Sequence, residues 1–520
     1  MKQKVFFILA LLFFGVTQGV EAQTHVSKLK MRTVDAEKWT VSPNPAEEGA
    51  TVKVTYTGRR KVMNVQAEKN LYTDLSMVDC AGNERQSQWT ANCYMVHTAG
   101  KYRLPLVYGN AIKNGEDNTS AYTGTDNWRC TQTFPNHEGN AINAPWITKS
   151  PDEKGADRGM GISVTQAELL WQDAKGLVTE VGIKGDYLTL TVGKDADEQE
   201  GNAVVAAKTA DGTIVWSWHI WVTRQTFAEA DLATFNTGKH IYKLTPVNVG
   251  WVGDRVSAGY SPYFQWGRKD AFIPADLTKL ETEGGETVGG GGGIPVGGWQ
   301  EPQTIYAANL VVYDINDNEV TGIKTKLDDD ATVADNIKNP TTLYRNVNLN
   351  GSYYFHQLCT PNQNPALNWW NAQQQDLEEG SDITANVATA TVKTVFDPCP
   401  AGFCVPTNNL FVYFESLDRE ALSIEESIPG RTLTDGESSV FFPFIGYRYN
   451  TDDGTVTRVS DVANAYYASS TCISSWDYYT YYKAFDFQIS LLDKSPSSAH
   501  PYYNILECCF ALPVRAVVEE

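Results

Sequence analysis

The sequence predicts a mainly β, multidomain protein, with β-sandwich-like regions first and an α+β region after them. Aromatic residues make up 12% of the chain, and Thr, Tyr and Trp fit the pleated, half-buried surface of a sheet. Short runs of alternating polar and apolar residues recur between Gly, Pro and Asn turns, which is typical of strands. Apolar residues at helical spacing stand out in one place, so few helices are expected.

The first element, residues 1–22, is predicted to be a secretory signal peptide. Lys2 and Lys4 make a basic start, residues 5–16 are apolar but for one glycine, and small residues follow. The apolar run is short for a membrane span, which needs about 20 residues, and a buried helix is the alternative. The protein is therefore expected to be exported to the periplasm, cell surface or medium, with no transmembrane segment after signal removal.

The next element, residues 23–84, is predicted to be a small β (Ig-like) segment. Val52, Val54 and Tyr56 fall on one face of a strand, and residues 61–65 are the predicted return strand after a turn. Residues 85–225 are predicted to be a β-sandwich-like domain. Its clearest hairpin has a two-residue turn at Asp211-Gly212 between two apolar runs.

The strand after that turn contains three tryptophans, Trp216, Trp218 and Trp221. Such a row is either a platform for stacking sugars or a buried strand face. The buried reading is favoured, because Trp brings much apolar area and both faces of this strand are mostly apolar.

Residues 240–520 are predicted to be an α+β domain. A glycine-rich insert at 284–298 has no helix start after it, so it cannot be a phosphate loop and is expected to be a mobile surface loop. One short helix is expected after Thr407, its N-cap, because Leu410, Phe414 and Leu417 recur at helical spacing.

The amino-acid composition and the motifs of the chain also limit the classes of function that it can have. With 62 acidic and 42 basic residues the net charge is −20, which repels phosphate backbones and makes nucleic acid a poor partner. No spaced pair of histidines suits a metal and no G-x-S-x-G elbow is present, so no catalytic residue and no metal site is predicted. Residues 314–319 (DINDNE) could bind calcium, but a hairpin turn is the favoured reading and no cofactor is expected. Residues 360–371 are interpreted as a loop, and the ligand-binding residues are unknown.

The segment CPAGFCVPT at residues 399–407 poses the sharpest question about chemistry. The chain has nine cysteines, an odd number, and export makes pairing possible. Cys399 and Cys404 are not spaced as a redox C-x-x-C, and no second pair or histidine lies near for zinc. A rigid structural turn is favoured, with or without a bridge; buried free thiols and a metal or redox pair are the alternatives.

This segment resembles the hallmark CPAGW-VPT of the Fibrobacter succinogenes major paralogous domain. Further segments that resemble the family follow in order, at residues 263–272 (YFQWGRKDAF), 442–449 (FPFIGYRY), 466–472 (YYASSTC) and 512–517 (LPVRAV). Residues 90–110 and 216–223 are similar to segments of exported, fimbrillin-like proteins of Bacteroides-type bacteria.

The resemblance implies a C-type-lectin-like fold and a surface-presented recognition scaffold. It also implies a bridge between the strand near Ala516 and Cys399. Because the family has Cys where this chain has Ala516, and Arg where it has Cys404, Cys508 or Cys509 is the expected partner for Cys399 or Cys404. The expected function is non-catalytic recognition or adhesion toward a host or bacterial surface glycan or protein. A surface enzyme acting on glycans and a structural pilus subunit are the alternatives.

Overall fold

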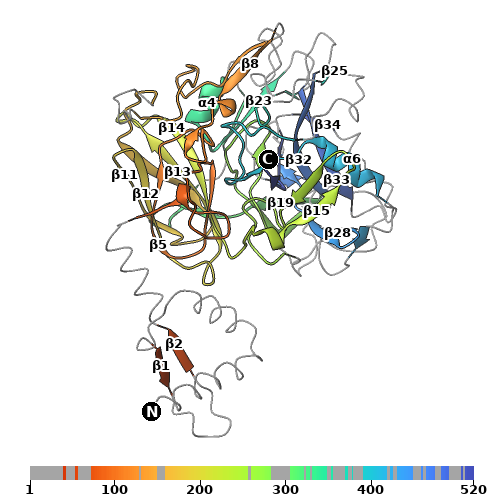
Figure 1. Ribbon diagram of the computed structural model, residues 1–520, viewed down its shortest axis with the longest axis horizontal. Coiled ribbons are helices and arrows are strands. Elements are labelled where there is room, and N and C mark those ends of the chain that lie inside the picture. Colours follow the sequence, from red (N-terminus) through yellow and green to blue (C-terminus); the bar gives the residue numbers. More distant parts are fainter. Residues whose placement is uncertain are drawn as a thin grey trace. The chain divides into compact units, whose positions relative to one another are not determined.

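The computed structural model describes residues 39–42, 53–56 and most of residues 72–520. Within 72–520 the description leaves out residues 128–129, 149–158, 256–258, 283–304, 321–323, 328–330, 348–352, 355–368, 373–376, 379–389, 418–421, 425–429, 449–457, 461–463, 475–481, 491–504 and 508–509. The chain divides into two compact units, residues 1–71 and 72–520. Strands dominate the described residues (Figure 1), so the prediction of a mainly β protein is confirmed.

The first unit contains one described hairpin. Strand β1 (Trp39–Ser42) pairs antiparallel with β2 (Lys53–Tyr56), with Val41 opposite Val54. The described part of the alternating run, residues 53–56, is a strand, as predicted, and it pairs with the segment before it. The predicted signal peptide at 1–22 and the predicted return strand at 61–65 lie outside the described residues.

Two sheets form a sandwich-like arrangement at the start of the second unit. The order of the first is β21-β20-β10-β13-β14-β4 and that of the second is β11-β12-β5-β3. β3 comes from the predicted 23–84 segment and pairs with β5, so part of that segment belongs to this unit. The strands are β3 (Thr73–Asp74), β4 (Cys93–Val96), β5 (Gly100–Pro105), β10 (Gln166–Gln172), β11 (Val178–Lys184), β12 (Tyr187–Val192), β13 (Gly201–Lys208), β14 (Ile214–Val222), β20 (Val312–Tyr313) and β21 (Glu319–Val320).

The hairpin between β13 and β14 turns at the predicted place, with a longer loop than predicted. Thr209 N donates to Thr213 O, and Gly212 N donates to Thr209 O. Gly212 alone in this turn has a positive φ, of 88°. A three-residue loop with glycine in the left-handed conformation replaces the two-residue turn, which in the type I′ form favoured by Asp-Gly requires two positive φ angles.

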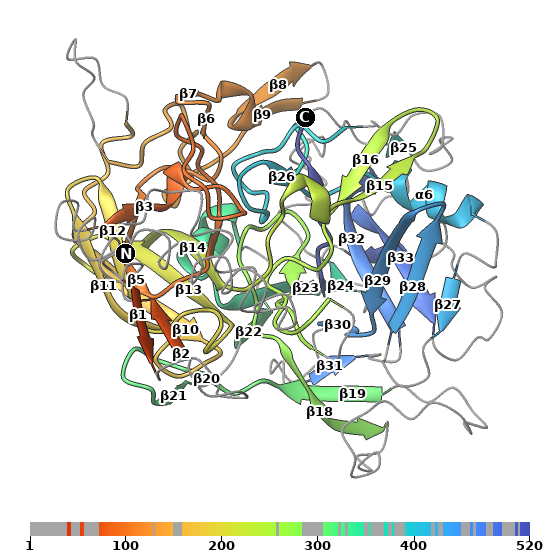
Figure 2. The same cartoon turned by 60° about the horizontal axis from the view of Figure 1, so that its bottom comes forward.

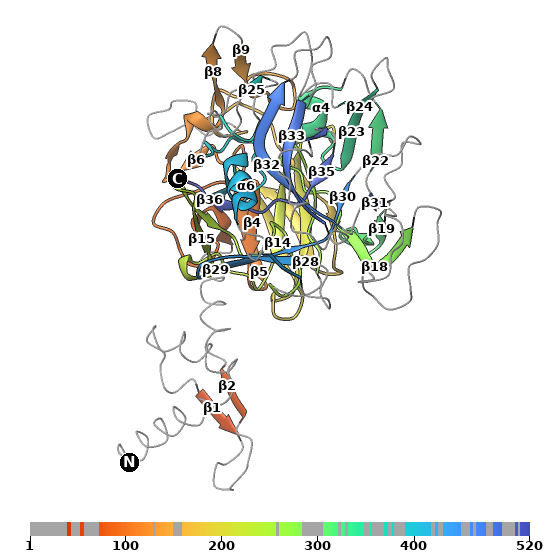
Figure 3. The same ribbon diagram turned by 90° about the vertical axis from the view of Figure 1, so that its right-hand side faces the viewer.

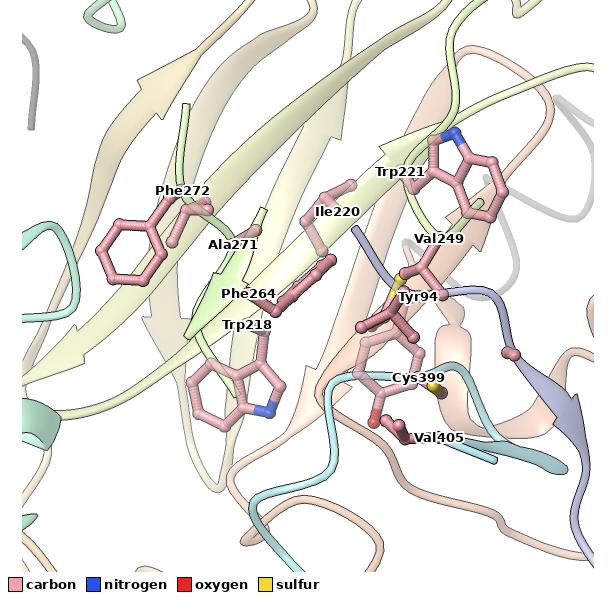
Figure 4. Packing of buried hydrophobic residues seen from close by; sticks show 14 of the residues in the cluster. Tyr94, Trp218, Ile220, Trp221, Val249, Phe264, Ala271, Phe272, Cys399 and Val405 are labelled. Atoms are coloured by element: carbon pink, nitrogen blue, oxygen red, sulfur yellow. The ribbon is translucent and has the colours of Figure 1, made fainter. Parts of the chain in front are cut away.

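The tryptophan strand is buried on both faces, as predicted. Trp216, Trp218 and Trp221 are each 1% exposed or less. Figure 4 shows Trp218 and Ile220 beside Phe264, which comes from the later half of the chain. This strand is therefore core, with no indole surface left for a sugar.

The remaining strands form further sheets of two to six strands, several of which combine distant parts of the chain (Figure 2). Small hairpins are β6 (Ile112–Lys113) with β7 (Glu116–Asp117) and β8 (Thr123–Asn127) with β9 (Cys130–Thr133). The others are β15 (Ala233–Asn236), β16 (Ile241–Leu244), β17 (Phe264–Gln265), β18 (Ala275–Thr282), β19 (Ile305–Asn309), β22 (Lys324–Leu327), β23 (Thr342–Val347), β24 (Tyr353–Tyr354), β25 (Leu377–Glu378), β26 (Phe403–Cys404), β27 (Leu422–Ile424), β28 (Gly430–Asp435), β29 (Ser438–Pro443), β30 (Tyr447–Arg448), β31 (Arg458–Ser460), β32 (Asn464–Ser474), β33 (Tyr482–Ser490), β34 (Ile505–Glu507), β35 (Ala511–Leu512) and β36 (Val517–Val518).

Helices are few and short. The described α-helices are α4 (Val333–Lys338) and α6 (Asn408–Ser416), with one-turn 3-10 helices at Leu75–Met77, Thr119–Ala121 and Glu229–Asp231. α6 is the predicted helix, and it lies beside β32 and β33 (Figure 3). Its N-cap residue is Thr407, but no side-chain bond caps the helix there. The Thr407 hydroxyl lies 3.1 Å from that of Tyr242, and Thr471 accepts the Asn408 N–H instead.

The predicted regions 85–225 and 240–520 share this second unit. β20 pairs with β10 of the first sheet. The amide of Asn92 donates to the carbonyls of Val395 and Asp397 at 2.7 and 2.8 Å. The segment just before the CPAGFC turn is thereby bonded to the sandwich. The glycine-rich insert, residues 360–368, Cys508 and Cys509 lie outside the described residues.

Candidate functional site

The CPAGFC turn is the first candidate, and its backbone explains its prolines and glycine. Phe403 N donates to Pro400 O at 3.1 Å, which closes a four-residue turn. Gly402, the third residue of that turn, has a φ of 86°. A type II turn requires a positive φ at this position, which glycine adopts without steric cost.

A buried ion pair holds the turn from inside. Lys393 Nζ lies 3.2 Å from an oxygen of Asp397, and both side chains are 0% exposed. Lys393 also donates to the carbonyls of Cys399, Pro400 and Phe403. The Asp397 carboxylate in turn accepts the N–H groups of Cys399 and Val405, at 2.8 and 2.9 Å. The charged side chains of Lys393 and Asp397 are thus bonded to backbone groups of the turn, and neither faces solvent. We call this ion pair with its bonds to the turn the clasp.

Electrostatics keep the thiols of the turn inert. Burial, together with the Asp397 charge, raises the pKa of Cys399 and of Cys404 well above the ordinary value. Burial also raises the pKa of Cys80 to about 12. Only the thiolate is a good nucleophile or metal ligand. These cysteines are therefore neutral, weakly reactive side chains in the folded protein.

Four cysteines in the described part of the chain are free and buried: Cys80, Cys93, Cys399 and Cys404. Cys93 forms a β-bridge to Pro400, and Cys80 Sγ lies 3.6 Å from Ala401 O. β26 pairs with β36, which places Cys404 opposite Val517. The turn therefore contacts the C-terminal strand at a point that follows Cys508 and Cys509 in the sequence, and these two were the partners expected for Cys399 or Cys404. No disulfide forms between described residues.

A second cluster of reactive groups lies under β14. Lys269 Nζ lies 2.5 Å from Ser217 Oγ and 2.6 Å from Asp270 Oδ1. Arg268 donates to the other Asp270 oxygen at 3.0 Å. All four residues are 5% exposed or less. A serine beside a lysine has the composition of a nucleophile and its base, so the protonation states decide what it can do.

Those states favour a structural role. Burial lowers the pKa of Lys269 and opposes the pull of Asp270. Burial would raise the pKa of Asp270, but Lys269 and Arg268 outweigh it, and its pKa lies below the usual value. A paired, charged lysine already donates its protons and cannot accept one from Ser217. The cluster bonds β14 to the segment YFQWGRKDAF, and the three consecutive charged residues in that apolar run were a sequence signal for it.

Three segments that carry the family resemblance each contribute one buried arginine. Arg268 donates to Thr342 O, Arg448 donates to Ile273 O, and Arg515 donates to Pro246 O and Phe441 O. Burial lowers the pKa of Arg448 to about 10. Each guanidinium satisfies carbonyls of a segment remote in sequence, so these motifs specify the core and not a surface.

The remaining sequence candidates have structural roles as far as the structure describes them. Asp314 Oδ1 accepts the N–H groups of Asn316 and Asn318, inside the hairpin of β20 and β21. The favoured turn reading of residues 314–319 therefore holds. Of residues 360–371, Trp369, Trp370 and Asn371 are described, and all are buried. No group of His, Cys, Asp or Glu within the described ranges could hold a metal ion.

Comparison with protein-family models, curated proteins and solved structures finds no match to this chain. Among the residues that the structure describes, no helix is both long and apolar enough to cross a membrane.

Proposed function

We propose that this protein is an exported, non-catalytic recognition or adhesion protein of the bacterial surface. Its partner is a glycan or a protein exposed on a host or bacterial cell. The signal-like residues 1–22 and the resemblance of the later half to a lectin-like domain support this proposal. The net charge of −20 supports a partner other than nucleic acid.

The observation that carries the proposal is the use made of the reactive side chains. The Lys393–Asp397 clasp, the Ser217–Lys269–Asp270 cluster and the arginines of three motifs are all buried and bonded to other segments. The Ser217 cluster joins residues 85–225 to residues 240–520, and the arginines bond remote segments of residues 240–520 to one another. A rigid body of this kind suits recognition, because a preorganised surface loses less conformational entropy on binding.

Export is tested first. The full chain is expressed in a bacterium that secretes it, and the N-terminus of the exported form is sequenced. Cleavage after Ala22 is expected, with the mature chain starting at Gln23. An uncleaved N-terminus on protein retained in the cytoplasm would contradict the proposal.

Recognition is then tested with the mature chain on arrays of glycans and of surface proteins, with unfolded protein as the control for non-specific adhesion. Saturable binding without any change in the ligand is expected. Release of a shortened glycan would instead favour the enzyme alternative. Concentration-dependent growth of sedimentable polymers would favour a pilus subunit. Absence of binding to every probe would count against recognition of these two ligand classes.

A further inference from the structure

The start of α6 is surrounded by buried polar side chains that carry no charge. Thr407 and Asn408, its N-cap and its first residue, are 0% exposed, and so are Ser470 and Thr471 of β32. Thr391, which stands shortly before the clasp, is 7% exposed. We call these five residues the α6 cluster. Three of them belong to the segments CPAGFCVPT and YYASSTC, which carry the family resemblance.

A bulge in β32 brings its part of the cluster to the start of the helix. The register between β32 and β33 is continuous up to Ala468 and resumes at Cys472, so residues 469–471 lie in the bulge. Bulges bend a strand and re-aim its side chains, and they are common beside functional sites. Ser470 N donates to Pro406 O at 2.7 Å. The bulge is thereby joined to the chain just before α6.

Three hydroxyl groups of the cluster are bonded within the protein. Thr391 donates to Val405 O at 2.7 Å. The Ser470 hydroxyl, 3.1 Å from that of Thr391, is therefore the donor of the bond between them. The hydroxyl of Thr407 faces that of Tyr242 at 3.1 Å. These bonds hold the three side chains in place.

The other two members have donors without an acceptor. Neither atom of the Asn408 side-chain amide has a hydrogen-bond partner among the described residues, and a buried amide in that state is rare and costly. The Thr471 hydroxyl accepts the N–H of Asn408 at 2.9 Å, but its own proton has no acceptor in the part of the chain that the structure describes. Asn408 and Thr471 thus present three donor hydrogens against one amide oxygen. What the site lacks is an acceptor.

The electrostatics of the site favour an acceptor with a negative charge. The N-terminus of an α-helix carries about half a positive elementary charge and binds anions. α6 has nine residues and no acidic residue in its first turn. Two ionisable groups contact the cluster, Cys404 through Thr391 and Tyr242 through Thr407, and burial raises the pKa of both, so each is neutral. Neither of them supplies the charge.

The size and charge of the ligand follow from the burial of the site. Each member of the cluster is 7% exposed or less, and none is a cation. A multiply charged or strongly hydrated anion, such as phosphate, is very costly to bring into such surroundings. A singly charged halide loses less hydration, and it accepts hydrogen bonds from amide and hydroxyl groups in any direction.

We propose that the α6 cluster binds a chloride ion, which accepts hydrogen bonds from Asn408 Nδ2 and from the Thr471 hydroxyl at the positive end of α6. The ion takes the place of a side-chain N-cap, which Thr407 does not provide because its hydroxyl faces Tyr242. It also lies between β32 and the chain that follows the CPAGFC turn. Chloride therefore joins two of the motifs that the later half of the chain shares with its lectin-like family.

The test is urea unfolding of the protein at constant pH and sodium concentration, while chloride replaces gluconate. Gluconate carries one charge but is too large for a buried site, and the net charge of −20 disfavours non-specific binding of anions. In the wild type the unfolding equilibrium constant should fall by about tenfold for each tenfold rise in chloride above its dissociation constant. Bromide should act in the same way, and its anomalous scattering in a crystal should place one ion beside Asn408 Nδ2.

Asn408→Leu is the decisive variant. It keeps the approximate size of the side chain and removes its donors, so the unfolding constant should no longer change with chloride. Asn336→Leu is the matched control. Asn336 is also a buried amide without partners among the described residues, at 3% exposed, but it is the fourth residue of α4 and not the first. Its variant should keep the chloride dependence of the wild type.

Thr471→Val provides a second variant if Asn408→Leu fails to fold. It keeps the shape of the side chain and removes one donor, so more chloride should be needed for the same effect. An unfolding constant that is equal in chloride and gluconate would overturn the site and leave water as the partner of Asn408. Equal chloride dependence in Asn408→Leu and the wild type, an unchanged requirement in Thr471→Val, or bromide bound only away from Asn408 would also overturn it.

Discussion

Lys393 and Asp397 form an ion pair of 3.2 Å, with no solvent exposure, between the sandwich and the CPAGFC turn. Asn110 of the sandwich donates to Lys393 O, and Asn92 donates to Asp397 O, each within 2.9 Å. The backbone of the pair is thus bonded to the first half of the unit, while its side chains hold the turn of the second half. One pair of residues therefore couples the two halves.

Loss of one member of this pair should be severely destabilising. Lys393→Met leaves the Asp397 carboxylate buried without its cation and frees three carbonyls of the turn, so a cost of about 3–5 kcal/mol is expected. Urea denaturation followed by circular dichroism gives the value. The matched control is Lys101→Met, which breaks the exposed 3.9 Å pair with Glu180 and should cost under about 1 kcal/mol. Equal costs in the two variants would contradict the clasp.

The tryptophan strand allows a sharper comparison than alanine scanning. Trp216 Nε1 donates to Asn92 Oδ1 at 3.0 Å, whereas Trp218 Nε1 has no hydrogen-bond partner among the described residues. Both positions lose similar volume on replacement by Phe, but only Trp216→Phe leaves Asn92 Oδ1 without its donor. Trp216→Phe should therefore cost about 1–3 kcal/mol more than Trp218→Phe.

Thermal or urea unfolding of the two variants measures that difference. Replacement of either residue by Ala should cost roughly 3–5 kcal/mol, as for other filled core sites. Free access of acrylamide to both indoles in the folded protein would be incompatible with this burial.

The glycine-rich insert at 284–298 should be dispensable. Thr282 of β18 pairs with Ile305 of β19, so the insert belongs to the connection of a hairpin whose ends already meet. Loop-closure entropy changes by only about 0.6 kcal/mol for each doubling of length. Deletion of residues 284–298 should alter the free energy of unfolding by about 1 kcal/mol or less. A large fall in melting temperature would show that the insert packs against the body.

The buried thiols should resist alkylation. Iodoacetamide at pH 8 should leave Cys80, Cys93, Cys399 and Cys404 unmodified in the folded protein and label them in urea, as read by mass spectrometry. Ile241→Cys is the positive control, because Ile241 is 54% exposed. Stoichiometric zinc or copper bound through these cysteines would refute their structural role and revive the enzyme alternative.

Local features of the sequence were sufficient to predict local structure. The apolar faces of β14, the turn near Gly212 and the spacing of Leu410 and Phe414 each depend on neighbours within a few residues. The roles of polar side chains depended on distant partners. Thr407 stands at the predicted N-cap, but its hydroxyl faces Tyr242, which is 165 residues away. No periodicity carries that information.

The roles of the buried charged residues could not be predicted for the same reason. Lys393 and Asp397 stand in the stretch TVKTVFDP, and a lysine among β-branched residues was a signal that could have been used. What the charges do depends on the path of the turn after them. The strands that pair with β4, β20 and β26 could not be predicted either, because pairing between remote strands produces no recognisable pattern in the sequence of either strand alone.

The pairing of β36 with β26 and β16 has a consequence for how the chain reaches this structure. Lys113 meets Glu519 across 406 residues, and Cys80 meets Ala401 across 321. Contacts so distant in sequence make folding slow, because much chain entropy is lost before they form. The turn also lacks its sheet partner until Val517 emerges from the ribosome. A nascent chain therefore stays incompletely closed until β36 has been synthesised, and the apolar residues of the turn lack their sheet partner until then.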